Sequence, residues 1–188
     1  MIISLIAALD ENRVIGYKNT IPWHIKDDLI RFKNKTVGHT VIMGRTTFDS
    51  LLGYYKKSGR PLPDRRHIIV SREVGYIVAV PNCFVANSID TAIQLAIEKE
   101  KAALHTSEVC KASENGQGRG EAEIFISGGA SLFKQTIDRA DRLYLTIVHG
   151  KYEGDTYFPE YSQFTKVIGK EDKKTKDGLE YTFLDLAR

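Results

Sequence analysis

The sequence contains few of the features that mark secreted, metal-binding or membrane proteins. Its two cysteines, Cys83 and Cys110, are too few for a disulfide framework, and no cysteine and histidine residues have the spacing of metal ligands. The apolar start, residues 1–9, lacks the basic beginning of a signal peptide and is too short to cross a bilayer. We therefore expect a reducing, cytoplasmic setting, with no metal and no membrane partner.

The sequence also has little excess charge. A formal net charge of +3 over 188 residues does not by itself indicate nucleic-acid binding. Positive charge is concentrated between residues 56 and 72. This segment contains one acidic residue, Asp64, and six basic residues: Lys56, Lys57, Arg60, Arg65, Arg66 and Arg72. A local field of this kind suits a ligand with phosphate or carboxylate groups, although a solvated loop would have the same composition.

Short apolar runs alternate with helical patterns along one predicted domain, residues 1–188. The runs are β-branched and continuously apolar, which is typical of parallel strands in a covered sheet: 2–9, 40–43, 67–71, 83–86, 124–127 and 142–148. Helices are expected over 25–35, from 46–47 onward, over 90–104 and after Gly128-Gly129. The pattern predicts an α/β fold, a mostly parallel sheet with flanking helices. Residues 164–170 and 181–186 predict an antiparallel C-terminal hairpin at one edge.

A polar, glycine-rich stretch interrupts this alternation at residues 105–122. It cannot bury enough apolar surface to order itself firmly, so we interpret it as a surface loop insertion. Its spacing Gly116-x-Gly118-x-Gly120 is similar to a dinucleotide fingerprint. No strand leads into it, however, and a strand follows it, so the context does not support phosphate binding there.

Asp28 is a carboxylate placed within an apolar stripe. Ile25, Asp28, Leu29 and Phe32 have the spacing of one helix face, while Asp27 and Lys33 fall elsewhere. A buried carboxylate is costly without a hydrogen-bonding partner, and a ligand with adjacent N–H donors would be such a partner. The simpler interpretation is an aspartate stabilised by the free N–H groups of a first helical turn.

Two strand-to-helix junctions have the composition of phosphate-binding turns. In the first, Gly44 and Arg45 lead into Thr46 and Thr47, and the second contains Gly128-Gly129. Glycine allows close backbone approach, and the free N–H groups of a helix start attract anions. Either could also be an ordinary turn, but two in one small α/β domain favour nucleotide binding. Ser71-Arg72, after a third strand, suits a further phosphate such as the 2′-phosphate of NADP.

Two further residues have alternative interpretations. Trp23 is either a core residue or the wall of a pocket beside Asp28, where its indole N–H would anchor a water molecule. Thr146 lies in the centre of an apolar strand. It is there either because threonine favours strands or because its hydroxyl group contacts Asp28. His24 is expected to be exposed.

Motifs spread over nearly the whole chain resemble, in order, those of the dihydrofolate reductase family. They are Ile6-Ala7-Ala8, Val14-Ile15-Gly16, Ile21-Pro22-Trp23 with Asp28, Ile42 to Thr47, Arg60 to Arg65, Ser127-Gly128-Gly129, Leu143 to Thr146 and Gly154 to Pro159. The resemblance implies a three-layer dihydrofolate-reductase-like fold. It implies reduction of 7,8-dihydrofolate to 5,6,7,8-tetrahydrofolate with NADPH, by hydride transfer to C6 and protonation at N5, in a monomer that is an antifolate target.

The resemblance also assigns roles to individual residues. Asp28 would hold the pterin ring and, with a water near Trp23, support protonation, while Thr146 supports the acid. The remaining substrate-binding residues would be Ile6, Phe32, Arg60, Leu62 and Arg65, of which Arg65 clamps the glutamate carboxylate. Those around NADPH would be Ala8, Val14, Ile15, Gly16, Tyr17, Lys18, Asn19, Thr20, Arg45, Thr46, Thr47, Ser71, Arg72, Asn87, Gly128, Gly129, Ala130, Ser131, Leu132, Phe133, Lys134 and Gln135. Residues 14–24 resemble the family's mobile lid, with Gly154-Asp155-Thr156 placed to brace it.

Three segments depart from the family's pattern, and two other functions remain as alternatives. The departures are a loop insertion near 51–59, the insertion near 105–122, and Ser127 at an often apolar position. One alternative is the reduction of another pteridine or of a riboflavin-pathway pyrimidine, which would leave Arg65 without a glutamate tail to hold. The other is an RNA-binding module, but residues 56–72 lack the interleaved aromatic residues that it needs.

Overall fold

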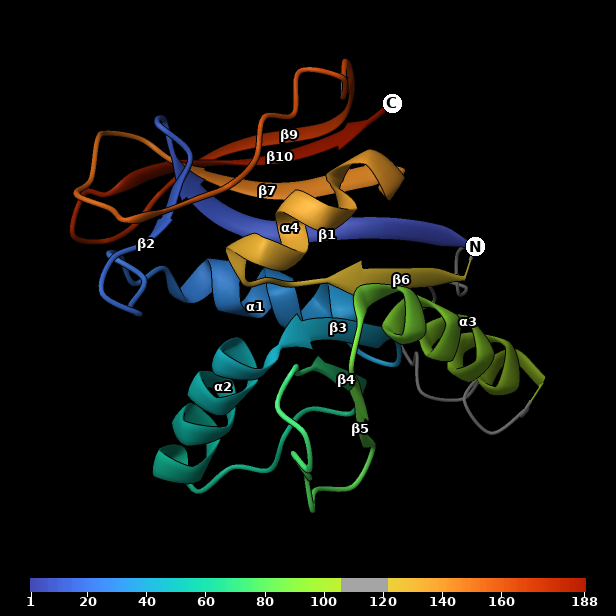
Figure 1. Ribbon diagram of the computed structural model, residues 1–188. Coiled ribbons are helices and arrows are strands. Elements are labelled where there is room, and N and C mark those ends of the chain that lie inside the picture. Colours follow the sequence, from blue (N-terminus) through green and yellow to red (C-terminus); the bar gives the residue numbers. More distant parts are fainter. Residues whose placement is uncertain (106–121) are drawn as a thin grey trace. The chain divides into compact units, whose positions relative to one another are not determined.

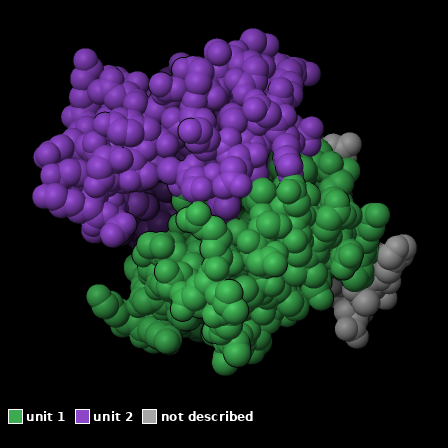
Figure 2. Space-filling view, viewed as in Figure 1, with its two compact units in different colours: residues 1–3, 36–129 green, residues 4–35, 130–188 purple. Residues whose placement is uncertain are grey.

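The computed structural model describes residues 1–105 and 122–188, which form two compact units. The first comprises residues 1–3 and 36–129, and the second residues 4–35 and 130–188 (Figure 2). Among the described residues, no helix is long and apolar enough to cross a membrane. The predicted glycine-rich insertion lies outside the described residues, apart from its two ends.

The first unit is a parallel α/β layer structure (Figure 1). Its strands are β3 (Thr40–Gly44), β4 (Arg66–Val70), β5 (Cys83–Ala86) and β6 (Glu123–Ile126), in the spatial order β5-β4-β3-β6. All three pairings are parallel. Helix α2 (Arg45–Ser58) connects β3 to β4, and α3 (Ile89–His105) connects β5 back to β6. Because these crossovers run in opposite directions, right-handed connections put the two helices on opposite faces.

The second unit combines parallel and antiparallel pairing. It contains most of β1 (Ile2–Asp10), together with β7 (Arg142–Val148), β9 (Lys166–Lys174) and β10 (Glu180–Ala187), in the order β1-β7-β10-β9. β1 and β7 are parallel, whereas β10 is antiparallel to both β7 and β9. Its helices are α1 (Lys26–Thr36, whose last residue belongs to the first unit) and α4 (Ala130–Thr136), followed by the 3-10 helix η2 (Ile137–Arg139).

Most elements lie where the sequence predicts them. The six predicted apolar strands and the C-terminal hairpin are present, and Ser88 caps α3 by accepting a hydrogen bond from the Thr91 N–H at 3.1 Å. Two very short strands were not predicted, β2 (Val14–Gly16) and β8 (Thr156–Tyr157), which pair antiparallel. Residues 51–58, expected as a loop insertion, are instead helical. They continue α2 to Ser58, where Gly59 ends the helix in the left-handed region at φ 64°.

The continuous apolar runs form the core of the first unit. Val41, Ile42, Ile68, Ile69 and Ile124 have no accessible surface, as expected for parallel strands covered on both faces. Such strands end together at one edge of the sheet, where the turns that follow them can meet a ligand. In this unit those turns are the two glycine junctions and Ser71-Arg72.

Candidate active site

Asp28 lies in the first turn of α1 and meets a threonine from the middle of β7. Thr146 is fully buried, and its Oγ1 donates a hydrogen bond to Asp28 Oδ1 at 2.6 Å. The strand fixes this hydroxyl, because Thr146 pairs with Ala8 of β1 on one side and with Phe183 of β10 on the other. Burial raises the pKa of Asp28, and the Thr146 hydrogen bond and the Arg31 charge offset part of that rise.

The apolar stripe around Asp28 is buried only in part. Ile25 is buried, Asp28 and Phe32 are half-buried, and Leu29 is 43% exposed. The expectation that Leu29 is buried with the stripe is therefore wrong. Arg31 faces β7 and β10, and residues two positions apart on a helix point in nearly opposite directions, so Leu29 points away from these strands. His24 and Lys33 are exposed, as predicted.

Trp23 is a core residue with one polar atom that the described residues leave unpaired. It belongs to a buried cluster with Ile25, Val148, Tyr181 and Phe183, and its ring packs edge-on against Tyr152 at 5.1 Å. Its indole Nε1 is buried and has no hydrogen-bond acceptor among the described residues. A buried N–H of this kind ordinarily finds an acceptor in a water molecule or ligand. The sequence places Trp23 three residues before Lys26, where α1 begins with the turn that carries Asp28.

The predicted lid, residues 14–24, is held by the segment that was expected to brace it. β2 pairs with β8, the Lys18 N–H donates to Asp155 Oδ2 at 2.9 Å, and the Asp155 N–H donates to the Gly16 carbonyl at 3.1 Å. Gly154 is required here, because a Cβ atom at this position would overlap the side chain of Val14. These contacts fix the first part of the lid against residues 154–157.

Asp10 is a further residue of this region, and the sequence analysis did not identify it. Its buried carboxylate ends β1 and accepts backbone hydrogen bonds from Asn12 at 2.9 Å, Val14 at 2.8 Å and Tyr152 at 2.9 Å. It therefore ties the start of the lid to the chain that leads into the brace. The sequence signal was a carboxylate at the end of an apolar strand, just before the lid.

In the first unit the two glycine junctions lie side by side. The Gly44 N–H donates to the Gly128 carbonyl at 2.7 Å, and the Ser127 N–H donates to the Ile42 carbonyl at 3.0 Å. Gly128 has φ 116°, a conformation that favours glycine, and it is joined to Gly129 by a cis peptide bond. α2 starts without a side-chain cap, which leaves its first N–H groups open to an anion. Ser127 Oγ is buried and has no partner among the described residues.

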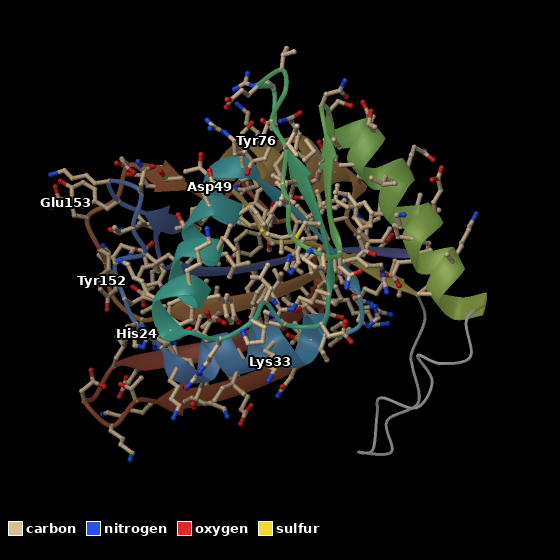
Figure 3. The ribbon with its side chains drawn as sticks, turned by 90° about the horizontal axis from the view of Figure 1, so that it is seen from below. His24, Lys33, Asp49, Tyr76, Tyr152 and Glu153 are labelled. Carbon is tan, nitrogen blue, oxygen red and sulfur yellow. The ribbon has the colours of Figure 1, made fainter. Side chains whose placement is uncertain are left out.

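The turn after β4 lies next to the first glycine junction, since Val70 pairs with Gly44. Ser71 is buried and Arg72 is exposed. Arg45 is not free beside it: its guanidinium forms an ion pair with Glu73 at 2.9 Å and lies 5.8 Å from the Tyr76 ring. The Tyr76 hydroxyl in turn donates to Asp49 of α2 at 3.0 Å, and both residues are labelled in Figure 3. Arg45 therefore follows β3 and Arg72 follows the adjacent strand β4, and Arg45 is already paired with Glu73.

A cavity of about 450 Å³ opens in the first unit beside the end of α2. Arg60, Leu62 and Arg65 line it, as does His67, which the sequence analysis did not single out. Burial lowers the pKa of Arg65 to about 10. Burial and the neighbouring Arg65 charge lower the pKa of His67 to about 4. The helical residues 51–58 contribute Leu52, Tyr55 and Lys56 to its wall.

The other predicted site residues differ in what they can offer a ligand. On β1, Ile6 is buried and Ala8 is half-buried, whereas Asn87 after β5 is exposed. In α4, Leu132 and Phe133 are buried, and Phe133 packs against Phe158 with ring centroids 4.8 Å apart. These two side chains therefore serve the core. The rest of this group is half-buried or exposed: Tyr17, Lys18, Asn19, Thr20, Ala130, Ser131, Lys134 and Gln135. Among the described residues, no three histidine, cysteine, aspartate or glutamate side chains lie close enough together to hold a metal ion.

Comparisons with known proteins agree with the predicted fold and family. The chain matches the family described as dihydrofolate reductase over residues 2–188. It is 34% identical to a dihydrofolate reductase of Staphylococcus aureus strain Mu50, covering 100% of this chain and 99% of that protein, and 36% identical to that of Bacillus subtilis, covering 97% and 92%. A solved dihydrofolate reductase from Enterococcus faecalis, complexed with NADP(H) and RAB-propyl, aligns with a TM-score of 0.74 at 27% identity, covering 100% and 96%. The predicted α/β fold is thereby confirmed, and the chain belongs to the dihydrofolate reductase family.

Proposed function

We propose that this chain reduces 7,8-dihydrofolate to 5,6,7,8-tetrahydrofolate with NADPH, and that Asp28 is the group that holds and protonates the substrate. The observation that carries the proposal is the half-buried carboxylate of Asp28, bonded to Thr146 and with a raised pKa. A carboxylate can bind a ring N–H and its neighbouring amino group through two parallel hydrogen bonds, which fixes the orientation of the ring.

The residues around the acid suit proton delivery. A raised pKa keeps a fraction of Asp28 protonated closer to neutral pH, where a general acid is most effective. The indole N–H of Trp23, which has no acceptor in the described part of the chain, supports its proposed role of orienting a water molecule or a substrate atom nearby. The apolar cluster behind Trp23 excludes water from this side of the acid.

The two glycine junctions suit the cofactor. Their hydrogen-bonded backbones, the absence of side chains at Gly128 and Gly129 and the uncapped start of α2 fit a pyrophosphate group. When bound, NADPH supplies the hydride. Arg72 would hold the 2′-phosphate with Ser71, and Arg45 would join it only after leaving Glu73. Residues 14–20, held by the 154–157 brace, would cover the cofactor.

The cavity beside α2 suits the substrate's carboxylate end. Arg65 and Arg60 both line it, and a guanidinium can bind a carboxylate through two hydrogen bonds. The apolar wall includes Leu62. Ile6 and Phe32 are the residues that we propose to contact the ring system. A substrate without a carboxylate tail would make no use of Arg65. If the enzyme reduced pteridines with and without this tail equally well, a different pteridine or a pyrimidine would be favoured as the natural substrate.

The central test is an assay of NADPH oxidation with dihydrofolate, followed by the loss of nicotinamide absorbance. We expect activity in the wild type and a fall in kcat of about 10²-fold or more for Asp28→Asn, a change in the range lost with a general acid. Binding of NADPH, measured by fluorescence, remains unchanged in this variant. A wild-type protein without activity would overturn the proposed function, and a fully active variant would overturn the role of Asp28.

The cofactor assignment has its own test. Arg72→Ala removes one charge-assisted contact, worth about 1.5–3 kcal/mol, so the Kd for NADPH is expected to rise by about 10- to 100-fold. NADH lacks the 2′-phosphate and serves as the matched control, because its Kd is expected to stay the same. Equal losses for the two cofactors would contradict a phosphate contact by Arg72.

The proposal extends to the setting in which the enzyme acts. We propose a cytoplasmic monomer whose partners are dihydrofolate and NADPH, without nucleic acid. The small net charge of +3 supports the last point. Sedimentation at micromolar concentration measures the mass directly, and a particle of twice the chain mass of 21.2 kDa would contradict the monomer.

A further inference from the structure

Arg31 lies one helical turn after Asp28 and reaches the strands beneath α1. Its side chain is only 11% exposed. Its Nη2 pairs with Asp185 of β10, and its guanidinium carbon lies 4.6 Å from the centre of the Phe183 ring. Its Nη1 points to the Leu145 carbonyl at 3.3 Å and to Thr146 Oγ1 at 3.4 Å. The residue that supports the acid is therefore itself contacted by a buried cation.

The direction of the hydrogen bonds at Thr146 follows from the chemistry of its neighbours. A guanidinium only donates, so the Thr146 oxygen must accept from Arg31. The same Nη1 also donates to the neighbouring Leu145 carbonyl at 3.3 Å, so two acceptors on β7 hold the guanidinium in place. The hydroxyl proton of Thr146 is then left for Asp28, where the donor and acceptor oxygens are 2.6 Å apart. Arg31 thus selects the orientation in which the hydroxyl supports the carboxylate.

Arg31 is a cation whose charge lowers the pKa of Asp28. Asp185 binds both Arg31 and Lys35, the latter at 3.1 Å, so the two acids and two bases of this group sum to zero when Asp28 is ionised. The other titratable groups of this region lie on α1, β7, β10 and β9: Asp27, Tyr144, Tyr181, Glu171 and Lys173. Lys35 Nζ lies 4.2 Å from the centre of the Tyr144 ring, Tyr181 donates to Asp27 at 2.9 Å, and Lys173 pairs with Glu171 at 3.0 Å.

We infer that Arg31 is a positioning residue of the acid site: anchored by Asp185, it orients the Thr146 hydroxyl toward Asp28 and stabilises the ionised carboxylate. The inference rests on the proposed function of Asp28. Both effects favour the charged form, and Arg31 is indeed among the groups that lower the pKa of Asp28. Arg31 therefore sets the pH at which the acid gives up its proton.

The test is the pH dependence of the hydride-transfer rate in Arg31→Leu. Without the cation the protonated form of Asp28 is favoured, so the variant keeps its proton to higher pH. Activity that depends on the protonated acid falls as pH rises through its pKa, and the midpoint of that fall is expected to move upward. The carboxyl carbon of Asp28, followed by ¹³C NMR in the NADPH complex, is expected to titrate with the same upward shift.

Two further variants separate positioning from folding. Lys35→Met removes a partner of the same Asp185 but does not contact Thr146, so its midpoint is expected to match the wild type. Arg31→Lys keeps the charge and is expected to restore most of the wild-type midpoint. If Arg31→Leu does not fold, Arg31→Gln, which loses the charge but keeps donor groups, replaces it in the same measurements.

The outcomes distinguish this inference from the proposed function. An active wild type whose Arg31→Leu or Arg31→Gln variant loses stability but keeps the wild-type midpoint would reduce Arg31 to a structural residue. An upward shift of equal size in Lys35→Met would also overturn the inference, because general loss of positive charge would then explain it. A wild type without dihydrofolate-dependent NADPH oxidation would instead remove the proposed function.

Discussion

At the scale of single residues, three carboxylates of the second unit meet the cost of burial in different ways. Asp10 accepts three backbone N–H groups, and Asp185 pairs with Arg31 and Lys35. Among the described residues, Asp28 has one hydroxyl donor, Thr146, and no backbone donor. Burial raises the pKa of Asp28, and the Thr146 hydrogen bond and the Arg31 charge offset only part of that rise, which suits an acid that must exchange its proton.

Gly154 offers a test at this scale. A Cβ atom in Gly154→Ala would overlap the Val14 side chain, so β8 must move away from β2. We expect a loss of about 1–3 kcal/mol in the free energy of unfolding, as for other overpacked sites, together with lower kcat. Gly53→Ala in α2 is the matched control: nothing lies within 4 Å of its Cβ, and it is expected to stabilise the helix by about 0.5–1 kcal/mol. Urea unfolding of both variants checks this, and a Gly154→Ala protein as stable as the wild type would contradict the required close approach.

At the scale of elements, the sequence predicted what depends on local pattern. The apolar strands were recognisable because both of their faces are buried. The two-residue β8 has no pattern of its own, because its pairing with β2 is set by tertiary contacts. The helical continuation of α2 was missed because the resemblance covers only segments that this chain shares with the family. Residues 51–59 are an insertion relative to the family's pattern, so the resemblance predicts nothing about their structure.

The same distinction applies to the candidate site. The contact between Asp28 and Thr146 was expected from the resemblance, since both residues lie in its motifs. Arg31 was missed, because its importance comes from partners far away in sequence. It meets Asp185 across 154 positions, a pairing that a single sequence does not reveal.

Glu100 provides a test for how α3 is attached to its sheet. Its buried carboxylate accepts from Arg66 Nη2 at 2.7 Å and from the Thr40 N–H, and thus links α3 to β3 and β4. Burial raises the pKa of Glu100, but His39, Arg66 and Thr40 together outweigh that rise and lower the pKa to about 2. Glu100→Gln leaves Arg66 without its charged partner, and we expect the free energy of unfolding to fall by about 2–4 kcal/mol at pH 7. Glu98→Gln, on the exposed side of α3, is expected to change it by less than about 0.5 kcal/mol. Equal values for the two variants would contradict the anchoring role.

At the scale of the whole molecule, the residues proposed to take part in the reaction belong to two compact units. The second contains the acid, its threonine, Trp23 and the braced lid, and the first contains the glycine junctions, Arg72 and the cavity with Arg65 (Figure 2). Loss of the Asp28 carboxylate leaves the glycine junctions of the first unit intact. Asp28→Asn is therefore expected to keep its affinity for NADPH.

The stability of the whole molecule toward acid is expected to depend first on His67. Its pKa is about 4 in the folded chain against an ordinary value of 6.5, so the unfolded chain binds more protons between these pH values and stability falls as pH is lowered through them. The full difference corresponds to about 3 kcal/mol. Glu100 contributes at lower pH, since the stability that it provides is complete above about 4.5 and is lost toward about 2.

Urea unfolding at pH 7 and at pH 4.5 separates the two groups. The wild type is expected to lose about 2–3 kcal/mol between these pH values, most of it through His67. His67→Gln removes the titrating ring and is expected to lose much less, while His24→Gln, whose side chain is exposed, is expected to behave as the wild type. If His67→Gln lost as much stability as the wild type, the acid sensitivity would have to come from other groups. The buried histidine would then be accommodated in its charged form, against the cost that burial beside Arg65 imposes.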